Sequence, residues 1–79
     1  MIYIDLKIFS LNKIIDLKLD ETILVSEVID EISSVFALND KQVILFSLFE
    51  KKILRPEYSL LEQGIRGGDR LILVERKNL

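Results

Sequence analysis

The chain has 79 residues, of which 49% are hydrophobic, and it carries 11 basic and 13 acidic side chains for a formal net charge of −2. This length predicts one domain, 1–79, and the apolar content is sufficient for a core. The charge balance gives no electrostatic reason to expect nucleic-acid binding. The sequence holds no cysteine and no histidine. These absences remove disulfides, the commonest general base and the commonest metal ligand, so we expect no catalytic residue, no metal and no cofactor.

The N-terminal part predicts a β-hairpin. Residues 1–9 and 14–19 each alternate between apolar and other side chains, which is the period of a half-buried strand. Residues 10–13 include Asn12 and predict the turn between them. The inward positions are Ile2, Ile4, Leu6, Ile8, Ile15, Leu17 and Leu19. Four outward positions predict neighbours of opposite charge on the exposed face: Asp5, Lys7, Asp16 and Lys18.

Residues 20–38 form the one segment with a clear helical period. Apolar residues recur at three- and four-residue spacings, which predicts a helix with one apolar stripe. The stripe consists of Val25, Val28, Ile29, Ile32, Val35 and Phe36. We expect the helix to begin at Val25 or Ser26 and to end at Phe36 or Ala37. Thr22 is a candidate N-terminal cap, and Asn39 is a candidate for a left-handed residue after the helix.

The C-terminal half predicts three further strands. Residues 42–49 are β-branched and aromatic, and they are apolar on both faces, so the residue pattern leaves open which face packs on the helix. Residues 53–54 predict a short strand, 58–63 a short helical turn, and 70–75 a last strand with Leu71 and Leu73 inward. This order of elements predicts an α+β fold of the β-grasp type. Four to five strands of mixed direction would pack on one helix, with the first and last strands side by side in parallel.

The chain resembles ubiquitin-like domains over nearly all of its length, and its C-terminal half carries the clearest pattern. The resemblance is carried by Leu54, by the segments 58–60 and 64–65, and by residues 67–74, which read GGDRLILV. Within that superfamily the chain is similar to the YukD/EsaB group in its opening at residues 3–5, in its helix entry and in the turn before the last strand. The helix entry consists of Val25, Val28 and Ile29. The apolar stretch at 42–49 departs from that group in length.

The YukD/EsaB group consists of small bacterial proteins associated with type VII (WXG-type) secretion systems. The resemblance implies a non-catalytic, cytoplasmic protein that acts as an accessory or regulatory component of such a system. Its implied partner is another protein, such as a membrane-embedded subunit of the secretion machine. The alternative is a regulatory or small subunit of a multicomponent bacterial enzyme. Neither a signal peptide nor a membrane-spanning segment is expected, and hence no direct membrane insertion.

Conjugated ubiquitin-like proteins and ubiquitin-like sulfur carriers require a free C-terminal Gly-Gly. The sequence here runs to Leu79, and its one Gly-Gly pair, Gly67-Gly68, precedes the last predicted strand. We therefore interpret this pair as a turn that needs positive φ. By this resemblance the protein is expected to be neither conjugated nor a carrier of sulfur.

Exposed apolar side chains are the best candidates for a site, because such clusters mark interfaces. The predicted protein-binding residues are Phe9, Leu11, Ile44, Phe46, Ile72 and Val74. Two alternatives remain open at this point: the same residues belong to the core, or they form the contact of a homodimer. The paired carboxylates Asp20-Glu21 and Asp30-Glu31 are interpreted as solvated surface.

Overall fold

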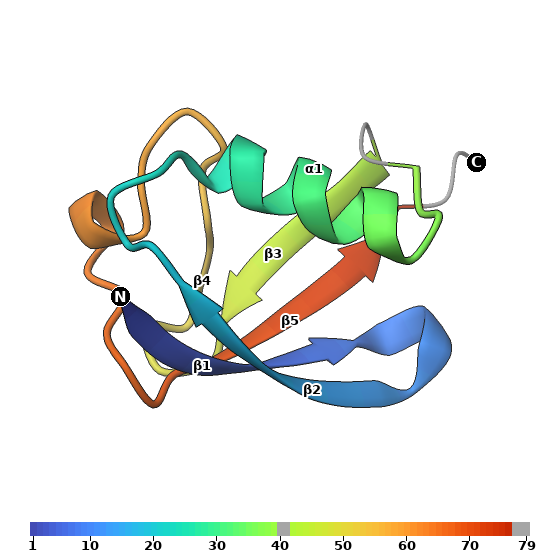
Figure 1. Ribbon diagram of the computed structural model, residues 1–79, viewed down its shortest axis with the longest axis horizontal. Helices are drawn as coiled ribbons and strands as arrows, with labels where there is room; N and C mark the ends of the chain where they lie inside the picture. Colours follow the sequence, from blue (N-terminus) through green and yellow to red (C-terminus); the bar gives the residue numbers. More distant parts are fainter. Residues whose placement is uncertain (40–41, 77–79) are drawn as a thin grey trace.

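The computed structural model describes residues 1–39 and 42–76, and it shows an α+β fold of five strands and one α-helix. The strands lie in one sheet in the order β2-β1-β5-β3-β4. Figure 1 shows α1 crossing one face of this sheet. The bounds are β1 (Ile2–Ile8), β2 (Lys13–Leu19), α1 (Val25–Val35), β3 (Val43–Ser47), β4 (Lys52–Ile53) and β5 (Arg70–Glu75). Short 3₁₀ turns η1 (Phe9–Leu11) and η3 (Leu61–Gln63) complete the described elements.

The first and last strands lie side by side at the centre of the sheet. β1 pairs with β5 in parallel and with β2 in antiparallel, and β5 also pairs with β3 in antiparallel. The expected β-grasp arrangement is therefore confirmed. A parallel pair needs a long crossover, and here the whole segment between β1 and β5 supplies it.

The core lies between the sheet and α1. The predicted alternation places the inward side chains of β1 and β5 in this core. Five residues of the predicted stripe of α1 pack against them, namely Val25, Val28, Ile29, Ile32 and Phe36, whereas the sixth, Val35, is 75% exposed and lies outside the core. In β3, Val43 and Leu45 are buried, whereas Ile44 and Phe46 are half-buried on the opposite face. The structure thus answers which face of this strand meets the helix. Full burial of each such aliphatic side chain stabilises the fold by roughly 1.5–3 kcal/mol.

The N-terminus of α1 is held by the crossover segment rather than by the predicted Thr22 cap. The amides of Val25 and Ser26 donate to the carbonyls of Tyr58 and Pro56, at 2.9 and 3.0 Å. Thr22 instead bonds the Asp20 carboxylate in the preceding turn through its amide and hydroxyl, at 2.9 and 2.6 Å. Carbonyls distant in sequence satisfy the free amides of the first turn, which local sequence does not reveal.

The left-handed residue after α1 is Ala37, two positions earlier than the predicted Asn39. Ala37 has φ of 55°, and the amide of Leu38 donates to the Ser33 carbonyl at 2.8 Å. This is the hydrogen-bond pattern that closes a helix when the chain reverses. The position favours glycine, because a Cβ is strained at positive φ.

The strand β3 ends at Ser47, two residues before the predicted end of the apolar run. The Ser47 hydroxyl donates to the buried carboxylate of Asp69 at 2.6 Å, and the Phe49 amide donates to the same carboxylate at 3.2 Å. The Glu50 amide then donates to the Ser47 hydroxyl at 3.0 Å. These bonds turn the chain into β4, so Leu48 and Phe49 lie in an exposed turn.

The Gly67-Gly68 pair forms the turn that leads into β5. Gly68 has φ of 89°, and its amide donates to the Tyr3 carbonyl at 2.7 Å. The predicted turn at positive φ is confirmed for Gly68. Both glycines are exposed, and the pair lies next to the start of β1.

Candidate functional site

A row of side chains crosses the face of the sheet that α1 leaves uncovered. The pairing register places Lys7 beside Ile14 and Ile72, Ile72 beside Phe46, and Phe46 beside Ile53. Residues paired in register project to the same face, so this row spans all five strands. Ile14 and Ile53 are 53% and 56% exposed, and Phe46 and Ile72 are half-buried.

A second apolar group lies next to this row. Ile44 and Val74 are paired across β3 and β5, two residues along from Phe46 and Ile72. Phe9 follows β1 and is 63% exposed, with the Lys7 ammonium 5.8 Å from the centre of its ring. We call these seven residues the outer patch: Phe9, Ile14, Ile44, Phe46, Ile53, Ile72 and Val74.

Five of the six predicted binding residues fall in the outer patch. The remaining one, Leu11, is exposed in η1, and no strand pairing assigns it to this face. The sequence prediction missed Ile14 and Ile53. Ile14 has the same parity as the outward residues Asp16 and Lys18, so the alternation already contained the signal. Ile53 could not be assigned to a face, because its strand has two residues.

A charged group lies beside the outer patch, and its arrangement differs from the one predicted. The register pairs Asp5 with Asp16, so two carboxylates face one another instead of opposite charges. The hydrogen bond that protonated Asp16 donates to the Asp5 carboxylate raises the pKa of Asp16, and the negative charge of Asp5 raises it further. The hydrogen bond with Asp16 lowers the pKa of Asp5, and the Arg70 guanidinium at 3.3 Å lowers it further. The pair therefore holds a shared proton on the Asp16 side as the pH falls.

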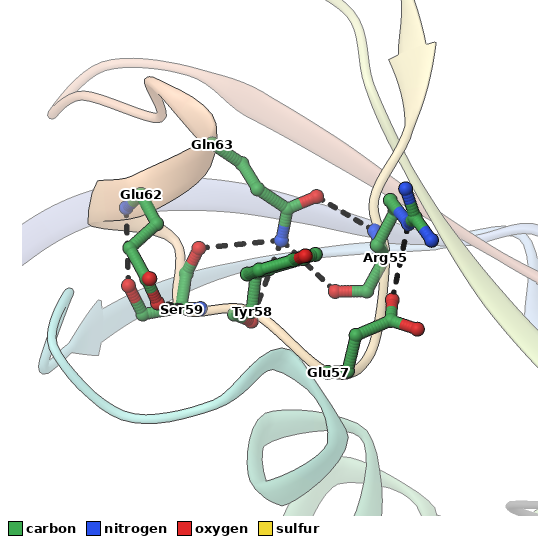
Figure 2. A network of polar contacts seen from close by, with 6 residues as sticks. All are labelled: Arg55, Glu57, Tyr58, Ser59, Glu62 and Gln63. Atoms are coloured by element: carbon green, nitrogen blue, oxygen red, sulfur yellow. Dashed lines mark hydrogen bonds and ion pairs between the residues drawn. The ribbon is translucent and has the colours of Figure 1, made fainter.

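A second polar cluster lies in the crossover segment, and Figure 2 shows it closely. The Gln63 side chain accepts from the Arg55 amide at 2.7 Å and donates to the carbonyls of Arg55 and Ser59 at 2.9 and 3.2 Å. Ser59 and Glu62 form a reciprocal capping box: the Ser59 amide donates to the Glu62 carboxylate at 2.9 Å, and the Glu62 amide donates to the Ser59 hydroxyl at 3.0 Å.

The polar cluster in the crossover makes its hydrogen bonds within the loop that carries it. Its polar atoms bond backbone groups of the loop, and the hydrogen bonds from the Ser59 amide and hydroxyl lower the pKa of Glu62. The Ser59 hydroxyl takes part in hydrogen bonds within the loop, because it accepts from the Glu62 amide and donates to the Glu62 carboxylate. Among residues 1–39 and 42–76, no three acidic side chains gather in a way that could hold a metal ion.

The described segments include no helix with the length and apolar content needed to cross a bilayer.

The comparisons with solved structures identify the fold. The N-terminal ubiquitin-like domain of the 4931431F19Rik protein is similar with a TM-score of 0.84 and 24% identity, over 99% of this chain and 77% of that one. A protein designed on the template of human erythrocytic ubiquitin gives a TM-score of 0.83 and 25% identity, over 100% and 96%. The ubiquitin-like domain of Arabidopsis thaliana protein At2g32350 gives 0.82 and 23%, over 98% and 79%.

No family model and no curated protein matches the chain. The fold defines the class, which is a ubiquitin-like β-grasp domain. Identities at this level establish a shared fold, and function has to be argued from the surface of this chain.

Proposed function

We propose that this chain is a non-catalytic protein-interaction module that docks through the outer patch. The observation that carries the proposal is the row of Ile72, Phe46 and Ile53, with Ile14 beyond Lys7, which places apolar side chains on four strands of the uncovered face. Contiguous apolar surface rimmed by polar residues is typical of protein interfaces. Asp5, Asp16 and Arg70 supply such a rim on one side.

In its finer form, the proposal makes the chain a cytoplasmic accessory or regulatory component of a bacterial type VII secretion system. The similarity of residues 3–5, of the helix entry and of residues 68–71 to the YukD/EsaB group supports this assignment. The partner would be a cytoplasmic portion of a membrane-embedded subunit of the machine. It would present an apolar surface to the outer patch and an acceptor group to Lys7.

The test measures binding of purified variants to that subunit portion by titration calorimetry. We expect Phe46→Asp and Val74→Asp each to weaken binding at least about 30-fold, because a charge at the centre of an interface is desolvated without a counter-charge. Leu61→Asp is the matched control: Leu61 is 58% exposed in η3, outside the outer patch, and its replacement should leave binding unchanged.

Each variant must first show a cooperative thermal transition, so that lost binding is not lost folding. If both Phe46→Asp and Val74→Asp bind as wild type does, the interface lies elsewhere and the docking proposal fails. If the wild-type chain purifies with oxygenase or hydrolase subunits and does not bind the secretion subunit, the role as a small enzyme subunit replaces the finer assignment.

A further inference from the structure

The strand β2 forms an edge of the sheet, and half of the backbone amides and carbonyls of β2 point away from the sheet. The Asp5 amide donates to the Asp69 carbonyl at 3.0 Å, so the main chain of Asp5 is directed toward the β5 side. Adjacent residues of a strand direct their amides and carbonyls to opposite sides. Ile4 and Leu6 therefore bond to β2, through their register partners Leu17 and Ile15.

By the same alternation, the amides and carbonyls of Ile14, Asp16 and Lys18 point to the open edge. No strand of the described chain pairs with them there. The strand is seven residues long and carries no proline. Such an edge is a template for a further strand unless something covers it.

An apolar groove runs beside this edge, between β2 and α1. Its lining includes the charged side chains of Lys18 and Glu31 in addition to Ile15, Leu17, Ile32, Val35 and Phe36. Val35 is the last residue of α1 and belongs to its predicted apolar stripe, yet it is 75% exposed. A strand added to β2 would bring side chains of alternate residues over this groove.

The charges along the edge indicate what kind of strand fits. Asp5 has Arg70 as its counter-charge, whereas Asp16 faces Asp5 on the neighbouring strand β1 and has no ion pair with a cation in the described chain. The Lys18 ammonium lies 5.7 Å from the Tyr3 ring, an exposed contact of modest strength. A strand that placed a cation against Asp16 and an anion against Lys18 would satisfy both.

We propose that the strand added to this edge is β2 of a second copy of the chain, in an antiparallel homodimer with its two-fold axis at Leu17. In this register Asp16 faces the partner subunit's Lys18, and by symmetry Lys18 faces the partner subunit's Asp16. Each of these facing pairs exchanges backbone hydrogen bonds through the groups that point outward. On the groove side, Leu17 meets the partner subunit's Leu17.

Charge and burial together select this register. A two-fold axis at Asp16 would place two Asp16 carboxylates against one another, which is repulsive. An axis at Ile15 would place Asp16 against an isoleucine and leave both charges without partners. With an axis between two residues, backbone groups that point to the open edge would face backbone groups that already bond to β1. Side chains on the groove side would then face side chains on the opposite side of the sheet.

The test uses charge reversal followed by mixing, with mass measured by sedimentation velocity and light scattering. We expect Asp16→Lys alone and Lys18→Asp alone to be monomeric at concentrations where the wild type is dimeric, because each puts like charges in both facing pairs. An equimolar mixture should form a heterodimer, since every facing pair is then opposite in charge. Dissociation constants of the single variants should rise at least tenfold.

Lys52→Asp is the matched control, with the same charge change on the opposite edge strand β4; it should dimerise as wild type does. Phe46→Asp should also leave the dimer intact, so failure of the docking proposal and failure of the dimer are separate results. A wild-type chain that stays monomeric at about 1 mM, a scale typical of weak association, overturns the proposal. An equimolar mixture of the two variants that stays monomeric also overturns it. So does a dimer that survives both single charge reversals, and so does a dimer that survives them but is abolished by Lys52→Asp.

Discussion

Single residues show where this fold is strained. Ala37 holds φ of 55° at the end of α1, and the left-handed conformation costs a residue with a Cβ about 1–2 kcal/mol. Glycine adopts this conformation without that strain, although it gains more freedom in the unfolded chain.

We therefore expect Ala37→Gly to increase the free energy of unfolding by about 0.5–1 kcal/mol, measured by urea denaturation. The matched control is Ser34→Gly, on the exposed face of α1 in right-handed conformation, where glycine should destabilise the protein. If both glycines shift the urea midpoint in the same direction, positive φ at Ala37 does not limit stability.

The Asp5–Asp16 pair predicts a dependence of stability on pH. The folded-state pKa of Asp16 lies above its ordinary value of 3.8, so the folded chain binds this proton more tightly than the unfolded chain does. Ionised Asp16 therefore lowers the free energy of unfolding once the pH exceeds its raised pKa, and this effect disappears when the pH falls below the ordinary pKa. Asp5 acts in the opposite sense: its lowered pKa stabilises the fold above the ordinary value, and this is lost as the pH falls.

Asp16→Asn should raise the melting temperature at pH 7, because the amide donates to Asp5 without adding a negative charge. The difference from wild type should shrink as the pH is lowered toward 3.8 and below, where Asp16 is protonated in both states. The melts are best recorded in dilute protein that light scattering shows to be monomeric. A difference that stays constant with pH would mean that charge repulsion is not its cause.

At the scale of elements, the crossover segment between β4 and β5 organises the start of the helix. Its carbonyls at Pro56 and Tyr58 receive the first amides of α1, and Gln63 ties the same segment together from inside (Figure 2). Gln63 is 9% exposed; its bond to the Ser59 carbonyl is buried, and its bonds to the backbone of Arg55 and Tyr58 are partly buried. Loss of this one side chain should therefore loosen both the crossover and the helix.

We expect Gln63→Ala to lower the free energy of unfolding by about 1–3 kcal/mol, because it leaves buried backbone groups without partners. The control within the same loop is Glu57→Ala. It removes the exposed Arg55–Glu57 ion pair, with both side chains more than half exposed, and such pairs contribute little. Chemical denaturation followed by circular dichroism compares the two; equal losses would assign the effect to the loop surface.

Element positions could be predicted from the sequence because periodicity records burial. Residues 1–9, 14–19 and 70–75 alternate, and the stripe of α1 has helical spacing, so these elements were located to within one or two residues. Element ends were harder. Thr22 and Asn39 were reasonable local candidates, but carbonyls of the crossover and a left-handed Ala37 take those roles.

The register in which the strands pair could not be predicted from the sequence pattern, and the charged part of the candidate site depends on that register. Opposite charges would face one another directly if Asp5 paired with Lys18, whereas the η1 turn, with Asn12 at φ of 49°, pairs Asp5 with Asp16. A shift of two residues keeps every side chain on its face, so alternation cannot distinguish the two registers. This is why the outer patch was predicted in large part while its charged rim was not.

At the scale of the whole molecule, the outer patch and the β2 edge adjoin one another at Ile14, which belongs to the patch and lies on β2. The outer patch lies on the face that α1 leaves uncovered, and the β2 edge lies at one side of the sheet, at the opposite end from β4. A dimer through β2 would leave the outer patch of each subunit accessible on one continuous sheet. Two partners, or a partner with two sites, would then be bound with increased avidity.

The position of β5 has a consequence for how this chain is made. β5 is the last strand in sequence, yet it lies at the centre of the sheet between β1 and β3 (Figure 1). When only the β1–β2 hairpin, α1 and β3 have emerged from the ribosome, β1 and β3 each have an edge that lacks its neighbour β5. Because the sheet closes through contacts between its first and last strands, cooperative folding waits for residues 70–75 to emerge. Until then the nascent chain exposes its apolar strands to chaperones and to aggregation.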